Sequence, residues 1–273
     1  MPFSKDLLIG SSGNQGGAFP FDFQIEQSAR FTRSESSYMN RTIQAGGSTR
    51  TWTLSFWIKL TGVAGLTNSQ YYIYTSKNNS QGYYDHITMH VGDGKPYIQF
   101  GGGEVTFDAV MTDTSAWYHM CIVADTTNGT AASRKRLYLN GTQIDPISAS
   151  YPSQNYDTML NSNSVHHIAA RQDTNSSYYG DYYLADFHFV DGYAYDASYF
   201  GESKDAPGGG SIWVPIDYKT NTGNYGTTGY YLTFSNASSL GADTSGNSND
   251  WSVNNMGADH QVADSPTFDD AGS

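Results

Sequence analysis

One short segment carries acidic and histidine side chains at a spacing that could support acid–base chemistry. Asp186 and His188 alternate within an apolar run, so in a strand they would share one face. Asp181 and Asp191 flank the same run. Retaining glycoside hydrolysis needs two carboxylates about 5 Å apart, as nucleophile and general acid. Because only one carboxylate and one histidine fall on the shared face, we expect no catalysis here. The alternative is a solvated or interface-facing sheet surface.

A polar run near the carboxyl end offers oxygen atoms at alternate positions. It surrounds Gly246 and comprises Asp243, Ser245, Asn247, Asn249 and Asp250. A hard cation such as calcium prefers oxygen ligands, although the run lacks the final bidentate glutamate of an EF-hand. A calcium site and a hydrogen-bonded turn of the Asx type are the two open interpretations. No other cofactor is expected.

Tyrosine is abundant, with 22 residues, and many lie in predicted polar loops or beside them. Aromatic rings contact the C–H patches of sugars while Asn, Asp and Ser bond the hydroxyls, so a sheet rimmed by such loops could bind a glycan. Tyrosine is equally enriched at protein–protein interfaces. Both interpretations apply to the candidate residues Tyr71, Tyr72, Tyr83, Tyr84, Tyr151, Tyr156, Tyr178, Tyr179 and Tyr182.

The charge balance bears on the partners that the protein could have. A net charge of -12 argues against a nucleic-acid surface, which needs clustered Lys and Arg. The one basic run, 134–136, is interpreted as a solvated strand edge that discourages unwanted pairing. No segment is apolar enough to span a bilayer or to serve as a signal peptide, so we expect neither membrane association nor secretion.

Alternation of apolar and polar residues predicts the elements that must position these side chains. Residues 51–60 place Trp52, Leu54, Phe56 and Ile58 on one face of a strand. Residues 116–141 predict an antiparallel meander with apolar side chains on both faces of its first strand. Asn-Gly at 140–141 suits the type I′ turn that closes the next hairpin.

These signals predict an all-β chain with three parts. Residues 24–202 form an antiparallel sandwich, preceded by an irregular arm at 1–23 and followed by an extension at 203–273. Neither end has a core of its own, yet both carry aromatic anchors. We therefore expect the extension to pack on the sandwich or on a neighbour, and the arm to attach the protein to a partner.

Two motifs carry a resemblance to a known fold family. The W-Y-H strand followed by L-Y-L-N-G, and the later G-D-Y-Y-L-A-D-F-H-F-V-D-G, resemble laminin-G-like and pentraxin-like domains. These belong to the concanavalin A-like jelly-roll sandwiches, which often hold calcium at a loop rim. The resemblance implies a laminin-G-like jelly roll over 24–202.

A longer series of blocks is similar to virion proteins of marine bacteriophages. It includes I-E-Q-S-A-R-F, R-T-W-T-L-S-F-W-I-K, W-V-P, G-Y-Y-L-T-F and D-T-S-G-N-S-N-D-W. The resemblance implies a non-enzymatic structural protein at the virion surface, a fibre, decoration or cement component that is made in the host cytoplasm. It would assemble with itself and with other virion proteins. A glycan-binding receptor module of a tail fibre is the alternative, and a glycan hydrolase is third.

Overall fold

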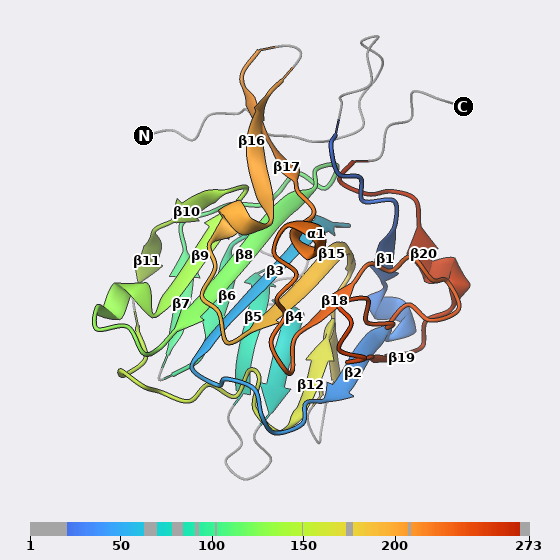
Figure 1. The fold of residues 1–273 in the computed structure, drawn as a ribbon. Coiled ribbons are helices and arrows are strands. Elements are labelled where there is room, and N and C mark those ends of the chain that lie inside the picture. Colours follow the sequence, from blue (N-terminus) through green and yellow to red (C-terminus); the bar gives the residue numbers. More distant parts are fainter. Residues whose placement is uncertain are drawn as a thin grey trace.

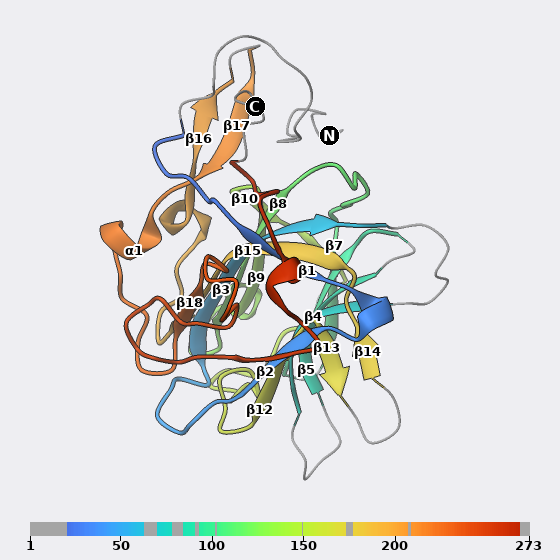
Figure 2. The same ribbon diagram turned by 90° about the vertical axis from the view of Figure 1, so that its right-hand side faces the viewer.

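The computed structural model describes residues 21–62, 70–77, 84–90, 93–101, 103–148, 150–172, 177–206 and 209–267. Two antiparallel sheets stack face to face, as Figures 1 and 2 show from two directions. Helix among these residues is confined to short turns, such as α1 (Tyr218–Asn221). None of these helices is long and apolar enough to cross a membrane. The prediction of an all-β antiparallel sandwich is confirmed.

The first sheet is built around the longest strands of the described chain. Its order is β10 (Thr142–Ile144), β9 (Lys135–Leu139), β8 (Tyr118–Asp125), β3 (Thr51–Leu60), β15 (Tyr182–Asp191), β1 (Ser28–Phe31) and β20 (Gln261–Val262), with β18 (Tyr230–Leu232) also paired to β15.

The second sheet lies across the core from the first. Its order is β11 (Pro146–Ser148), β7 (Glu104–Phe107), β6 (Pro96–Gln99), β5 (Tyr84–His90), β4 (Gln70–Lys77), β12 (Val165–Ile168), β2 (Tyr38–Thr42) and β19 (Ser252–Asn254). Two separate hairpins complete the strands, one formed by β13 (Ala170–Gln172) and β14 (Ser177–Tyr179), the other by β16 (Gly201–Asp205) and β17 (Ser211–Pro215).

The main core fills the space between the two sheets. The predicted face of β3, with Trp52 and Phe56 among its members, is fully buried there, which confirms the alternation seen in the sequence. Trp52 stacks on Phe189 with ring centroids 5.7 Å apart, and Phe56 stacks on Phe187 at 5.3 Å. Contacts of this kind join β3 to β15 through their side chains as well as their backbones.

A second apolar cluster covers the opposite side of the first sheet. Trp57 and Cys121 point away from the main core, yet they are buried by residues from the chain after β15, including Phe200, Trp213 and Tyr218. In Figure 2, α1 lies on this outer side. The second cluster explains why both faces of β8 are apolar.

The Asn-Gly turn after β9 adopts the predicted geometry. Asn140 has φ +46° and Gly141 φ +79°, the positive values that a type I′ turn requires. The Asn140 side chain accepts a hydrogen bond from the His119 backbone N–H at 2.8 Å. A Cβ on Gly141 would lie 2.3 Å from the Trp213 ring, so the position requires glycine for space as well.

The basic run at 134–136 is not a solvated edge, and that prediction was wrong. Lys135 in β9 is 2% exposed and its ammonium lies 4.5 Å from the centre of the Phe100 ring. The backbone carbonyls of Ile98, Gly103 and Ser150 accept its hydrogen bonds at 3.0 to 3.5 Å. Strand alternation points Lys135 inward while its neighbours point outward, and the carbonyls make its burial tolerable.

The carboxyl-terminal extension lies on its own sandwich and supplies strands to both sheets. β18 and β20 pair with β15 and β1, and β19 pairs with β2. Near the end, Asp264 accepts hydrogen bonds from Lys59 at 2.7 Å and from Trp117 at 3.0 Å, and Thr267 bonds the backbone of Ile25. Of the predicted arm, residues 1–20 lie outside the described part of the chain.

Candidate ligand-binding face

The outer face of the second sheet carries polar and aromatic side chains in two rows across its strands. The members on β4, β12 and β5 are buried, whereas those on β6 and β7 are half-buried or exposed. Backbone register sets these rows, because directly opposed residues of neighbouring strands share a face. One row is Tyr72, Thr88, Tyr97 and Thr106, and the other is His167, Thr75, His86, Gln99 and Glu104. The alternate residues, such as Ile87, Ile98 and Val105, fill the main core.

A cation–aromatic stack stands at one end of these rows. The Arg171 guanidinium lies 4.5 Å from the Tyr178 ring centre and 5.1 Å from that of Tyr72. Arg171 also donates to the Tyr72 hydroxyl at 2.9 Å, and Tyr72 meets His86 edge-on at 5.5 Å. Tyr178 remains 44% exposed. In this stack the Tyr178 ring faces the solvent, whereas the Tyr72 ring lies on the sheet.

The β13–β14 hairpin positions this stack over β4. Thr75 donates its hydroxyl to the Ala170 carbonyl at 2.8 Å, and Arg171 is paired with Tyr178 across the hairpin. Tyr179, the next residue, packs on Tyr38 of β2 with centroids 6.0 Å apart. Three of the predicted tyrosines, Tyr72, Tyr178 and Tyr179, thus come together on the outer face of the second sheet.

Two other predicted tyrosines belong to the main core. Tyr182 is fully buried and Tyr71 is 3% exposed, and their rings meet at 6.1 Å. Tyr182 donates its hydroxyl to the Tyr72 carbonyl at 2.7 Å. Their positions next to polar loops suggested exposure, but strand alternation turns both rings inward. Neither ring can therefore touch a ligand in this conformation.

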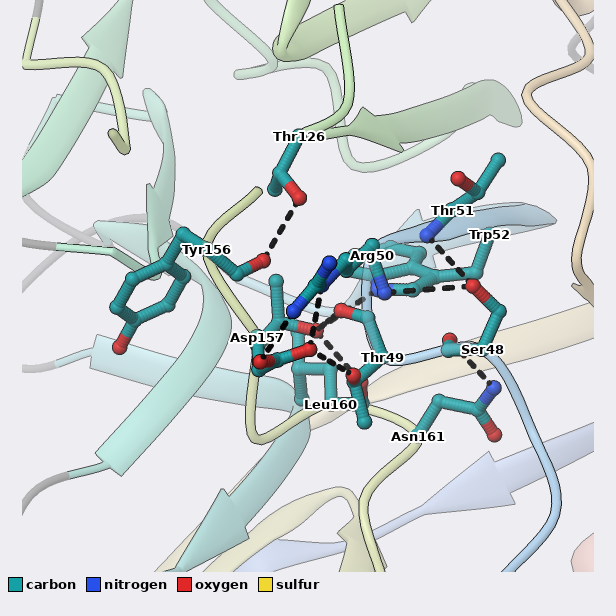
Figure 3. Close-up of polar contacts among 11 residues, drawn as sticks. Ser48, Thr49, Arg50, Thr51, Trp52, Thr126, Tyr156, Asp157, Leu160 and Asn161 are labelled. Atoms are coloured by element: carbon teal, nitrogen blue, oxygen red, sulfur yellow. Dashed lines mark hydrogen bonds and ion pairs between the residues drawn. The ribbon is translucent and has the colours of Figure 1, made fainter. Parts of the chain in front are cut away.

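Tyr151 and Tyr156 lie in a loop at the end of the sandwich, and both are half-buried. Figure 3 shows how this loop is fixed. The Tyr156 carbonyl accepts from the Thr126 hydroxyl at 2.7 Å, and Asp157 accepts from Arg50 Nε at 2.8 Å. Hydrogen bonds from Arg50 and Thr49 hold the pKa of Asp157 at about 2. Tyr84 opens β5, and Tyr83 lies outside the described residues.

Hydrogen bonds within the protein occupy the proposed calcium loop. Asp243 Oδ1 accepts from the Tyr231 and Ser245 backbone N–H groups at 2.9 and 2.8 Å, and Oδ2 accepts from the Ser245 hydroxyl and the Asn249 N–H. Asn249 in turn accepts from Arg41. Asp250 accepts from the Asp243 N–H at 2.8 Å, and the Asn247 amide donates to two backbone carbonyls. This pattern is the Asx-type alternative.

No group of three or more His, Cys, Asp or Glu that could hold a metal occurs in the described part of the chain.

The Asp186 and His188 pair is buried instead of solvated. Asp186 is 3% exposed and His188 1%, because Tyr225 and Tyr231 of the extension cover them. Asp186 Oδ1 lies 3.0 Å from His188 Nε2 and accepts from the Tyr231 hydroxyl at 2.6 Å. His188 Nδ1 lies 3.0 Å from the Tyr225 hydroxyl. The prediction of a solvated surface was wrong, because the covering tyrosines lie more than thirty residues further along the chain.

Arg171 was missed by sequence reasoning, as were Tyr97, Gln99 and Glu104 of the rows. Each stands alone in a short polar stretch, and only the pairing of distant strands brings them to one face. An arginine three residues after the end of β12, with a tyrosine pair across a turn, is the one local signal that could have indicated the stack.

A family model matches the part of the sequence that forms most of the sandwich. Residues 33–193, more than half of the chain, match the model of the concanavalin A-like lectin/glucanases superfamily. The chain belongs to this superfamily. No curated protein sequence matches it.

Solved structures show similarity of fold at low sequence identity. A SAP-like pentraxin of Limulus polyphemus is 16% identical with a TM-score of 0.45, covering 63% of this chain and 79% of its own. A putative carbohydrate-binding protein of Bacteroides ovatus is 14% identical with a TM-score of 0.49, covering 64% and 46%. Mouse laminin α1 domains LG4-5 are 11% identical with a TM-score of 0.43, covering 70% and 47%. The aligned region thus spans less than half of the last two chains.

Proposed function

We propose that the protein is a non-enzymatic binding module that binds glycans on the outer face of the second sheet. The observation that carries the proposal is the Tyr72–Arg171–Tyr178 stack, which ends in an exposed aromatic ring beside rows of polar side chains. Membership of a lectin-containing superfamily supports it.

The chemistry of the face suits a sugar ring. The 44% exposed Tyr178 ring can cover a C–H patch, and Arg171 keeps this ring in place. Half-buried Gln99 offers an amide donor and acceptor, and exposed Glu104 accepts hydroxyl protons. Such weak, polar contacts fit a ligand that is recognised by many copies of one protein on a particle.

The same face gives the reason for proposing a non-enzymatic role. Glu104 is the one carboxylate in the two rows. Glycoside hydrolysis by paired carboxylates needs a second acid at about 5 Å to about 9.5 Å. A face with one carboxylate can bind a glycan without cleaving it.

Assembly at the surface of a bacteriophage particle is the second candidate function. The resemblance of the sequence blocks to virion proteins supports it, and so does the β16–β17 hairpin, which projects from the body in Figure 1. Lys204 of this hairpin pairs with Asp22, near the end of the predicted arm. A two-stranded hairpin is marginally stable alone, so a projecting one suits a contact with another virion subunit or a second copy.

Binding to an array of bacterial surface polysaccharides tests the first proposal. Tyr178→Ala should remove binding, whereas Tyr199→Ala should leave it unchanged. Tyr199 is a matched control because it is 39% exposed and lies in a different part of the surface. Equal binding by both variants would exclude the Tyr178 stack as the glycan site.

The same variants separate glycan binding from assembly. Particles that contain Tyr178→Ala together with Tyr179→Ala should stay intact but fail to bind polysaccharide. Release of the double variant from the particle would instead assign the stack to an interface between subunits.

A further inference from the structure

A cavity of about 180 Å³ lies on the other side of the molecule from the tyrosine stack. One wall is the segment 23–27, and the other is formed by Asp186, Tyr231, Thr233 and Ser235. The cavity therefore lies where the beginning of the described chain meets the carboxyl-terminal extension. It is distinct from the outer face of the second sheet and does not depend on the proposed function.

Asp186 is the buried polar group of this cavity. Its side chain is 2% exposed. Both of its contacts, with the Tyr231 hydroxyl and with His188 Nε2, reach Oδ1. Within the described part of the chain no donor bonds Oδ2. Oδ2 is not among the fully buried side-chain atoms that lack a partner, so it can be reached from the cavity that Asp186 lines. A carboxylate oxygen that is accessible and free of protein donors is suited to a ligand with N–H groups.

The backbone at Asp186 supports a specialised role. Its φ is +50°, and the register between β15 and β3 shifts between Ala185 and His188. This bulge turns the Asp186 carboxylate out of the strand's regular alternation. Left-handed backbone at a non-glycine residue persists only when its surroundings enforce it.

The lining selects the charge of a ligand. Asp186 and Glu26 are acidic, and among the described residues that line the cavity none is lysine or arginine. An anion would therefore be repelled. Phe23 and Tyr231 add aromatic rings to the same walls, and aromatic rings attract cations through their negative faces.

We propose that this cavity binds an organic cation of the alkylguanidinium class. Its N–H groups donate to Asp186 Oδ2, its alkyl stem lies along Phe23 and Tyr231, and Glu26 at the exposed end adds a second negative charge. A free guanidinium compound and an arginine side chain of another protein chain share this chemistry.

The test uses n-propylguanidinium, with the neutral, nearly isosteric n-propylurea as its matched control, titrated into the full chain at constant ionic strength. Calorimetry should show saturable binding of n-propylguanidinium and none of n-propylurea. Asp186→Asn should weaken binding about ten-fold or more, because a charge-assisted bond is lost. Asparagine tolerates left-handed backbone, so the fold should persist.

Two further variants keep the result interpretable. Glu26→Gln lies on an exposed side chain, so it should weaken binding several-fold without affecting folding. Asp145→Asn removes the same charge from an exposed site outside the cavity and should change nothing. Equal binding of n-propylurea, or wild-type affinity in both Asp186→Asn and Glu26→Gln, would overturn the proposal.

A tripeptide, acetyl-Gly-Arg-Gly-amide, distinguishes the two sources. Binding at least as tight as that of n-propylguanidinium would identify an arginine side chain as the ligand. Binding of n-propylguanidinium alone would identify a free compound. Absence of saturable binding by both would show that the cavity takes no guanidinium ligand.

Discussion

The Trp213 indole N–H donates a hydrogen bond to His119 Nδ1 at 3.1 Å. Nδ1 is therefore the acceptor nitrogen, and Nε2 carries the proton that it donates to the Ser55 hydroxyl at 2.8 Å. His119 is held as a neutral ring in one tautomer, so it cannot act as a base for Ser55 or for the nearby Cys121. Burial raises the pKa of the Cys121 thiol, which leaves it uncharged and unreactive.

The first prediction concerns stability in acid. Burial lowers the pKa of His119 from 6.5 to about 3; the smaller influence of Asp186 raises this pKa and that of His188 lowers it. Between these pH values the unfolded chain binds the proton and the folded chain does not, so stability is lost as pH falls. Each such histidine contributes a slope of about 1.4 kcal/mol per pH unit.

Urea denaturation between pH 6 and pH 4 checks this slope. Both pH values lie between the unfolded pKa of His119, about 6.5, and its folded pKa, about 3. The stability difference between wild type and His119→Gln should shrink by about 1.4 kcal/mol per pH unit as the solution becomes more acidic. A difference that stays constant with pH would contradict a neutral buried His119. His166, whose pKa is lowered to about 4, should behave similarly.

The second prediction concerns Lys135. Lys135→Met keeps the apolar stem but leaves three carbonyls without their donor. The free energy of unfolding should therefore fall by about 2–3 kcal/mol. Chemical denaturation measures the change. Lys95→Met, at a surface ion pair with Asp108, is the control and should leave the midpoint unchanged. If Lys135→Met leaves the free energy of unfolding unchanged, the three carbonyls must accept hydrogen bonds from water instead.

The third prediction concerns the turn at Gly141. Gly141→Ala brings a Cβ against the Trp213 ring and strains a positive φ, so we expect a loss of about 2 kcal/mol. Gly129→Ala is the matched control, because no atom lies within 4 Å of the added carbon. The thermal midpoint should fall for the first variant alone.

The fourth prediction concerns the extension. Removal of residues 212–273 deletes Trp213, Tyr218 and Tyr231 from the second apolar cluster. It also removes β18, β19 and β20 from the two main sheets and most of β17. The truncated chain should precipitate or bind a hydrophobic dye such as ANS. A chain that ends at residue 267 keeps every contact described above and should remain soluble. A soluble, dye-negative 1–211 chain would show that the sandwich folds without its extension.

Local patterns were sufficient to predict the elements. The alternation through Trp52 and Phe56 identified the face of β3 that fills the core. The Asn140-Gly141 pair identified the turn between β9 and β10. Both signals depend on residues within a few positions of one another, where backbone geometry alone decides the outcome.

Placement of side chains on the finished molecule was less predictable. Tyr182 and Tyr72 both look like loop-edge tyrosines, yet one is buried in the core and the other supports Arg171. Asp186 looks like a surface residue until Tyr225 and Tyr231 cover it. In each case the outcome depends on a partner from a distant segment, which no local pattern encodes.

The pairing of β1 with β20 has a consequence for synthesis of the protein. Ala29 lies opposite Gln261 in the first sheet, and at the edge of the second sheet Met39 lies opposite Val253. At about 10 residues per second, a ribosome would leave one edge of each early strand open for roughly 20 s, until β20 and β19 emerge. The two sheets can therefore be completed only after translation is nearly finished, and the open edges of β1 and β2 are what a nascent-chain chaperone would have to shield.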